Sequence, residues 1–149
     1  MNALPGTTGR RRIYLMRHGF VDYTSKEVVE SQDPSRARLT ERGRVEARAA
    51  GAALAEVSFD LAIHSGLART IETMDLVLSE HPEAITLEEE QRFEELRSGQ
   101  YIDFQSAEQL AATMTFQIEQ AGEPGATFLT GGEKFADAMS RIEDGLIDL

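Results

Sequence analysis

Three consecutive residues, Arg17, His18 and Gly19, follow directly on a short apolar run near the start of the sequence. The run, residues 13–16, is too short for a helix, and it predicts a buried strand that ends where the polar residues begin. Ligands bind at the carboxyl ends of strands in open α/β sheets, so these residues would lie at a ligand-binding edge. A guanidinium beside an imidazole can hold a phosphate next to a nucleophile, although three residues alone are weak evidence for such a site.

Two later segments hold side chains that could complete the same site. Arg69 lies about one turn into a predicted helix that follows a second apolar strand at residues 61–64, so it can also reach the strand edge. Residues 92–101 place two adjacent carboxyl groups, Glu94 and Glu95, before a glycine turn, where one of them could serve as an acid. Taken singly, an arginine on an amphipathic helix is usually a surface residue, and a run of charges is usually solvated.

The elements that must position these residues alternate along the chain. Besides the two strands already described, a strand is expected at 85–87. The predicted helices are 40–56, 67–78, 104–120 and one from 133 onward. The predicted irregular loops are 21–38 and 122–132. This order predicts an α/β fold of three layers, α/β/α, with a mainly parallel sheet between the helices.

Local signals refine the first two of these helices. Thr40 is expected to cap the first helix, and Ser65 the second, because a hydroxyl oxygen can accept a hydrogen bond from the first free N–H groups. The first helix also carries a stripe of small residues suited to close packing on a sheet. The stripe consists of Val45, Ala49, Ala52 and Ala53.

Length and composition limit the classes of function. At 149 residues the chain is long enough for one domain, predicted to span 13–149 after a flexible tail at 1–12. The net charge of −11 argues against nucleic acid and membrane surfaces as partners, so an anionic substrate must be attracted by a local arginine cluster. The absence of cysteine excludes thiol chemistry, and no apolar run is long enough for a membrane span or a secretion signal. We therefore expect a cytoplasmic protein.

Five separated motifs, in this order, resemble the histidine phosphatase superfamily, the phosphoglycerate mutase-like proteins. The motifs are Arg17-His18-Gly19, Leu39-Thr40-Glu41-Arg42-Gly43, Ser65-Gly66-Leu67-Ala68-Arg69-Thr70-Ile71-Glu72-Thr73, Glu95-Leu96-Arg97-Ser98-Gly99 and Gly131-Gly132-Glu133. The resemblance covers residues 13–149, and any single motif would be weak evidence. It implies a phosphoglycerate mutase-like fold and a phosphomonoester hydrolase that acts through a phosphohistidine on a small-molecule substrate.

The resemblance also implies a role for each residue. His18 is the expected nucleophile, Arg17 and Arg69 hold the phosphate oxygens, and Glu95 rather than Glu94 is the general acid. A carbonyl that accepts from the other ring nitrogen of His18 would set its tautomer. Gly19 and Thr24 are expected at substrate-binding positions, with Thr24 standing where many members carry asparagine. The implied chemistry needs no cofactor and no metal.

One family residue is missing from the pattern. A second histidine is expected beyond the helix that begins near Gly132, and neither His64 nor His81 is placed to replace it. The sequence therefore resembles a C-terminally truncated, N-terminal portion of a histidine phosphatase, and we expect impaired activity and possible self-association through an open sheet edge. Two alternatives stay open: a catalytically impaired, phosphatase-like binding module, and a phosphoglycerate mutase-type phosphotransferase.

Overall fold

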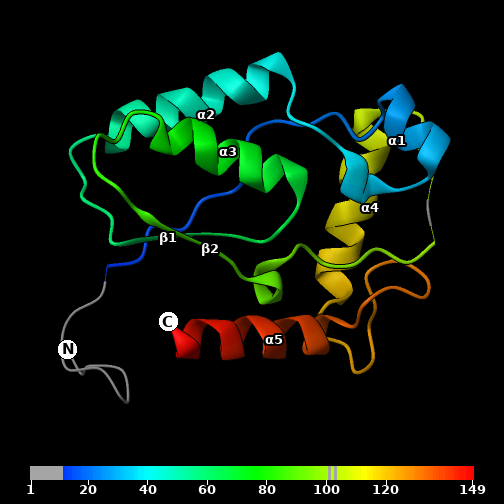
Figure 1. Cartoon of the computed structure of the whole chain (residues 1–149). Coiled ribbons are helices and arrows are strands. Elements are labelled where there is room, and N and C mark those ends of the chain that lie inside the picture. The colour runs from blue at the N-terminus through cyan, green and yellow to red at the C-terminus, as the bar shows by residue number, and fades with distance from the viewer. Residues whose placement is uncertain (1–11, 101, 103) are drawn as a thin grey trace.

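The computed structural model describes residues 12–100, 102 and 104–149, so the predicted tail lies outside the described residues apart from Arg12. The chain combines helices with parallel strands (Figure 1). Its helices are α1 (Lys26–Ser31), α2 (Glu41–Leu54), α3 (Ala68–Leu78), α4 (Ala107–Gln120) and α5 (Phe135–Asp148). Its strands are β1 (Leu61–His64) and β2 (Thr86–Glu89), and its short 3-10 helices are η1 (Pro34–Arg36) and η2 (Gln91–Phe93).

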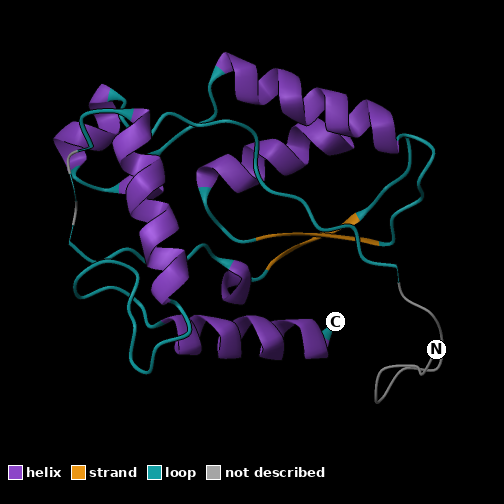
Figure 2. Ribbon diagram, turned by 180° about the vertical axis from the view of Figure 1, so that it is seen from behind, coloured by secondary structure: helices purple, strands orange, loops and turns teal. Residues whose placement is uncertain are grey.

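The two strands and α3 form a β–α–β unit. β1 and β2 pair in parallel, from Leu61 opposite Thr86 to His64 opposite Glu89. Both strands therefore end at one edge, where the backbone N–H of Glu90 still donates to the carbonyl oxygen of His64 at 2.9 Å. α2 and α3 lie on one side of the strand pair and α5 lies on the other (Figures 1 and 2). This arrangement confirms the predicted α/β class, with two strands in the described part of the chain.

The predicted strand at residues 13–16 is wrong. This segment is irregular, and its apolar side chains are exposed, Leu15 to 93%. An apolar run becomes a buried strand only where neighbouring strands pair with its backbone groups, and within the described residues β1 pairs with β2 alone. Tyr14 instead packs edge-on against Phe59, with the ring centroids 5.5 Å apart. Arg17 and His18 are consequently positioned by contacts other than a strand.

α2 packs against α3 through its smallest residues. The buried residues of α2 are Gly43, Ala47 and Gly51, spaced four apart. A methyl group at Gly51 would lie 2.6 Å from the carbonyl oxygen of Val77 in α3, so the helices meet too closely for larger side chains. The predicted stripe is therefore on the wrong face of the helix. Its four members are all exposed: Val45, Ala49, Ala52 and Ala53.

The predicted helix caps have different outcomes. Thr40 caps α2 as expected, because its Oγ1 accepts from the backbone N–H of Gly43 at 3.2 Å. Ser65 does not cap α3, whose N-cap residue is Leu67. Gly66 turns the chain between them with a φ of +88°, and the hydroxyl of Ser65 donates to Thr70 Oγ1 at 3.4 Å instead.

Residues 21–38, predicted as an irregular loop, contain α1 and η1 and have a small core of their own. The core residues are Val21, Val28, Ala37 and Leu39. Asp33 caps η1 by accepting from the backbone N–H of Ser35 at 2.9 Å, and Pro34 occupies a first-turn position that needs no N–H. Val28 lies in a six-residue helix, Ala37 follows η1, and Val21 and Leu39 form an isolated strand bridge, so the core residues show no period in the sequence.

The C-terminal part of the chain forms the predicted helices α4 and α5 and the loop between them. α5 packs against η2, where a methyl group at Gly145 would lie 2.8 Å from the ring of Phe93. This contact brings the C-terminal helix beside the segment that carries Glu94 and Glu95. In the part of the chain that the structure describes, no helix is long and apolar enough to cross a membrane.

Replacing Gly51 by alanine is expected to destabilise the protein, although alanine is the better helix former. At an exposed position this change would stabilise the helix by about 1 kcal/mol. Here the added methyl group must displace the Val77 backbone, and such overpacking typically costs roughly 1–3 kcal/mol. Urea unfolding measures the difference, with Ala52→Gly at an exposed position of the same helix as the control for helix propensity. A Gly51→Ala midpoint at or above that of the wild type would contradict the close approach.

Candidate active site

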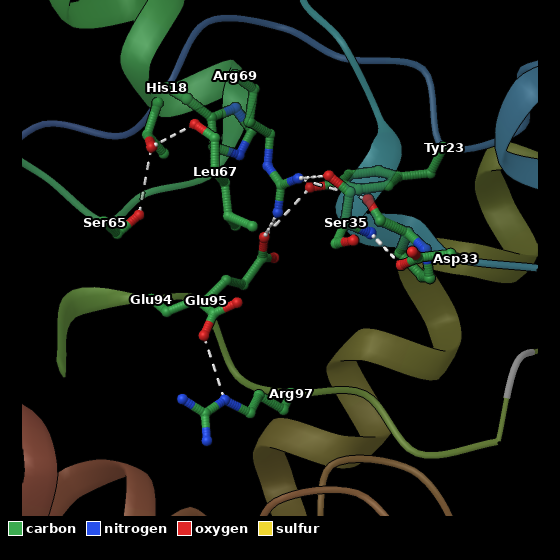
Figure 3. A network of polar contacts seen from close by, with 12 residues as sticks. His18, Tyr23, Asp33, Ser35, Ser65, Leu67, Arg69, Glu94, Glu95 and Arg97 are labelled. Atoms are coloured by element: carbon green, nitrogen blue, oxygen red, sulfur yellow. Dashed lines mark hydrogen bonds and ion pairs between the residues drawn. The ribbon is translucent and has the colours of Figure 1, made fainter. Parts of the chain in front are cut away.

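The buried guanidinium of Arg69 joins three separate segments of the chain (Figure 3). Arg69 lies in the first turn of α3, and its side chain is only 3% exposed. Its Nη2 donates to Glu95 Oε2 at 2.7 Å. Its Nη1 donates to the carbonyl oxygens of Ser35 at 3.1 Å and Pro34 at 3.4 Å. The guanidinium of Arg69 in α3 therefore contacts both the 3-10 helix η1 and the segment after η2.

Glu95 and Tyr23 both contact the guanidinium of Arg69. The hydroxyl of Tyr23 donates to Glu95 Oε2 at 3.4 Å, and Arg69 Cζ lies 5.8 Å from the centroid of the Tyr23 ring. Burial and the negative charge of Glu95 raise the pKa of Tyr23, so its hydroxyl keeps its proton and remains a donor. The side chain of Glu95 is 46% exposed, which leaves its carboxylate open to solvent. Glu94 turns instead to Arg97, whose Nε lies 3.2 Å from its Oε2 (Figure 3).

The hydrogen bond of His18 selects its tautomer. Its Nδ1 lies 2.8 Å from the carbonyl oxygen of Gly19, which can only accept, so Nδ1 carries the proton and Nε2 keeps a free lone pair. Burial lowers the pKa of His18 below its usual value of 6.5, and the positive charges of Arg69 and Arg17 lower it further. The Gly19 carbonyl and Glu95 act in the opposite direction without reversing the shift. The imidazole is therefore neutral at pH 7, as a nucleophile must be.

The remaining predicted residues have different surroundings. Arg17 is exposed, and its positive charge acts to lower the pKa of both His18 and Tyr23. Gly19 is buried, and its N–H donates to Thr73 Oγ1 at 3.1 Å, so that donor is already used within the chain. Thr24 is exposed and its hydroxyl donates to Asp22 Oδ1 at 2.7 Å. Among the described residues, no hydrogen bond joins Thr24 to Arg69 or Glu95.

Thr73 is a positioning residue that the sequence did not reveal. It is 4% exposed and lies one turn after Arg69 on the same face of α3. Its Oγ1 accepts from the N–H of Gly19 and donates to the carbonyl oxygen of Arg69 at 2.7 Å. One hydroxyl thus attaches the segment that carries His18 to the helix that carries Arg69. The only sequence signal for this role is the spacing of four residues between Arg69 and Thr73, which puts both on one face of the helix.

The other two histidines do not reach this cluster. His64 Nδ1 accepts from the backbone N–H of Gly66 at 3.0 Å, in the turn after β1. The side chain of His81 is fully buried and packs against the ring of Phe59, with the centroids 5.1 Å apart. No group of histidine and carboxylate side chains within the described residues could hold a metal ion.

This arrangement combines three chemical functions at one place. Arg17 and Arg69 can bind an anion, the free lone pair of His18 Nε2 can attack an electrophile, and Glu95 can exchange a proton. His18 Nε2 and Arg69 Nε are both buried without a hydrogen-bond partner among the described residues. Buried polar atoms are nearly always paired, so a ligand that supplied partners to these two atoms would remove an unfavourable feature of the cluster. Both ring nitrogens of His81, outside the cluster, are also without a hydrogen-bond partner among the described residues.

The family and the fold are both represented among known proteins. The chain matches the Histidine phosphatase superfamily (branch 1) over residues 13–149. Its structure is similar to that of YhfR from Bacillus stearothermophilus, with a TM-score of 0.64 and 21% identity, and to Mycobacterial hydrolase 1, with 0.62 and 23%. It is also similar to the structure of a mycobacterial glucosyl-3-phosphoglycerate phosphatase, solved with inorganic phosphate, with a TM-score of 0.61 and 21% sequence identity. No curated protein sequence matches the chain.

These solved proteins are longer than the present chain. Each comparison covers 89% of this chain, but only 63% of YhfR, 61% of the mycobacterial hydrolase and 59% of the glucosyl-3-phosphoglycerate phosphatase. At these levels of sequence identity the likeness shows a common fold. It supports the fold expected from the five sequence motifs and leaves the chemistry to be argued from the residues.

The lowered pKa of His18 makes stability depend on pH in a defined direction. Because the unfolded chain binds this proton more readily, the free energy of unfolding should rise with pH through the window below 6.5 and level off above it. His18→Asn should remove that part of the pH dependence, and Arg17→Gln should raise the pKa of His18. Denaturant unfolding on both sides of pH 6.5, together with NMR titration of the ring, tests both statements. If the free energy of unfolding of His18→Asn rose with pH as steeply as that of the wild type, the result would contradict them.

Proposed function

Because this chain belongs to the histidine phosphatase superfamily, we propose that it hydrolyses small-molecule phosphomonoesters through a phosphohistidine on His18. The observation that carries the proposal is the tautomer of His18, whose Nε2 lone pair is free beside the buried guanidinium of Arg69. Glu95 completes the set, because its carboxylate contacts the same guanidinium and is open to solvent.

In the first step the two arginines bind the phosphate and His18 attacks it. Arg17 and Arg69 hold the phosphoryl oxygens, and both guanidinium groups stay charged at every physiological pH. The lone pair of His18 Nε2 forms a bond to phosphorus while the bond to the ester oxygen breaks. Glu95, in its protonated form, gives a proton to that oxygen so that the product leaves as an alcohol. Nδ1–H keeps its hydrogen bond to the Gly19 carbonyl, which stabilises the positive charge on the ring.

In the second step water releases the phosphoryl group. The Glu95 carboxylate accepts a proton from the attacking water as its oxygen bonds to phosphorus, and the bond to Nε2 breaks to return neutral His18. Inorganic phosphate is the product, and Glu95 is protonated again for the next cycle. A phosphate that takes the N–H groups of Arg69 would leave Glu95 beside an anion instead of a cation. That exchange favours the protonated carboxyl group that the first step requires.

The same residues support two other outcomes. A mutase-type phosphotransferase would pass the phosphoryl group from His18 to a second hydroxyl group instead of water. A binding module would hold a phosphorylated ligand at Arg17 and Arg69 without transfer. The products distinguish the three: inorganic phosphate for the hydrolase, a new phosphomonoester for the mutase, and neither for the binding module.

Turnover of an aryl phosphate and acid-quench trapping test the proposed reaction. Wild-type protein should release inorganic phosphate and give an acid-labile phosphohistidine, and His18→Ala should abolish both. Glu95→Gln should lower the rate roughly 10²–10⁴-fold with alkyl phosphates, whose leaving groups need a proton, and much less with aryl phosphates. His64→Gln is the control histidine, since its Nδ1 accepts from the backbone N–H of Gly66 in the turn after β1. Full activity in His18→Ala would exclude the mechanism.

Affinity for inorganic phosphate tests the anion site without turnover. Glu95→Gln should bind phosphate roughly 10-fold more tightly, about 1.4 kcal/mol, because the competing carboxylate on Arg69 becomes neutral. Arg69→Met should lose measurable binding. Isothermal titration with inorganic phosphate measures both, and Glu94→Gln, which changes the neighbouring carboxylate paired with Arg97, is the control. Weaker binding by Glu95→Gln would contradict the competition.

A further inference from the structure

Arg141 makes an unusually complete set of hydrogen bonds outside the cluster described above. It lies in α5, and all five N–H donors of its guanidinium have acceptors. Nε and Nη2 donate to the two carboxylate oxygens of Glu133, at 2.6 and 2.8 Å. Nη1 donates to the carbonyl oxygens of Arg92 and Glu94, at 2.6 and 2.8 Å, and Nη2 reaches that of Glu95 at 3.4 Å.

Glu133 fixes the same segment from its other side. Its side chain is 11% exposed, and its Oε2 accepts from the backbone N–H of Arg97 at 3.2 Å. The backbone N–H of Glu133 in turn donates to the carbonyl oxygen of Arg97 at 2.9 Å. The hydrogen bonds to Arg141 lower the pKa of Glu133, so the pair stays ionised. Together the two side chains hold the backbone of residues 92–97 against α5.

We propose that Arg141 is a positioning residue for Glu95, which it holds through the backbone so that the carboxylate meets Arg69. This inference rests on the proposed function, because it assigns a task to the group that acts as the acid there. Glu95 is held at two points: its carbonyl oxygen contacts Arg141 and its carboxylate contacts Arg69. Without the first contact, a side chain that is 46% exposed would depend on the second contact and on Tyr23 alone.

The chemistry of the guanidinium explains why arginine is needed at this position. Three carbonyl oxygens and a carboxylate must be satisfied at once by groups that lie in one plane. Lysine keeps the charge but offers three donors around a single atom, so Arg141→Lys cannot bind Glu133 in bidentate fashion and also reach the carbonyls. The lysine variant therefore retains the charge of α5 while it releases the segment that carries Glu95.

The titration of His18 tests the inference independently of turnover. The charge of Glu95 raises the pKa of His18, so any change that lets Glu95 move away should lower it. NMR of the full chain should show a lower His18 pKa in Arg141→Lys and in Glu95→Gln, and no further fall in the double variant. An unchanged pKa in Arg141→Lys, or an equal fall when Glu95 is already glutamine, would overturn the proposal.

The dependence of the rate on the leaving group is the second measurement. Misplacement of a catalytic group by about 1 Å can cost 10²-fold, so kcat of Arg141→Lys should fall roughly 10- to 100-fold with an alkyl phosphate. With 4-nitrophenyl phosphate, whose leaving group needs little protonation, it should fall less than about 3-fold. Equal losses with both substrates would overturn the proposal. If the wild type has no turnover, the proposed hydrolysis is wrong and the His18 titration still decides the role of Arg141.

Two further variants separate positioning from general stability. Glu133→Gln keeps the side-chain volume but weakens the hydrogen bonds to Arg141, so it should also lower the His18 pKa. This variant replaces Arg141→Lys in the test if that protein does not fold. Asp148→Asn removes the ion pair with Arg92, a second contact between α5 and η2 that touches neither Glu94 nor Glu95. It should leave the His18 pKa and the leaving-group ratio unchanged. A change as large as that of Arg141→Lys would overturn the proposal.

Discussion

A buried positive charge imposes the strictest requirement on this structure. The Arg69 side chain is almost inaccessible to solvent, and a buried guanidinium is tolerated only when acceptors replace its hydration. The chain provides these acceptors from two distant segments, the carbonyl groups of Pro34 and Ser35 and the carboxylate of Glu95. The position of Arg69 therefore dictates where η1 and the segment after η2 must lie.

The close approach of α2 to α3 makes that position attainable. Gly51 lets α2 touch the backbone of α3, and Gly43 allows the same with the chain at residues 19–20. Because Thr73 then attaches Gly19 to α3, His18 is brought to the face that carries Arg69 although it is not part of a strand. Small residues and a single hydroxyl thus position His18 beside Arg69.

The charges of the chain are unevenly distributed. The chain carries a net charge of −11, yet the positive charges of Arg69 and Arg17 add to the effect of burial in lowering the pKa of His18. The excess of carboxylates lies elsewhere, and several of them serve as partners that hold arginines in place, as Glu133 does for Arg141 and Glu72 for Arg44. An anion at the proposed site would therefore be attracted by the local arginine side chains, against the field of the whole molecule.

Patterns within short segments were sufficient to identify many of the elements. The strand at 61–64, the Thr40 cap and the helices that became α2 to α5 were predictable, because hydrogen bonds and periodic burial within each segment decide them. The motif order also singled out Arg17, His18, Arg69 and Glu95, and in the structure the charges of the two arginines and Glu95 all act on the imidazole of His18. Their catalytic roles remain part of the proposed function.

Contacts between distant segments decided what the sequence could not. The apolar run at 13–16 suits a strand, but its exposure depends on whether other strands lie beside it. The buried face of α2 was mistaken because glycine has no hydrophobic signal, although only glycine permits the approach to Val77. Likewise, the roles of Thr73 and Arg141 depend on partners that are distant in the sequence. Thr73 binds the N–H of Gly19, and Arg141 binds the carbonyl oxygens of Arg92 and Glu94. Local sequence determines how a segment can fold and which chemistry it can carry, whereas the partners of a backbone or buried charge are set only when remote segments pack together.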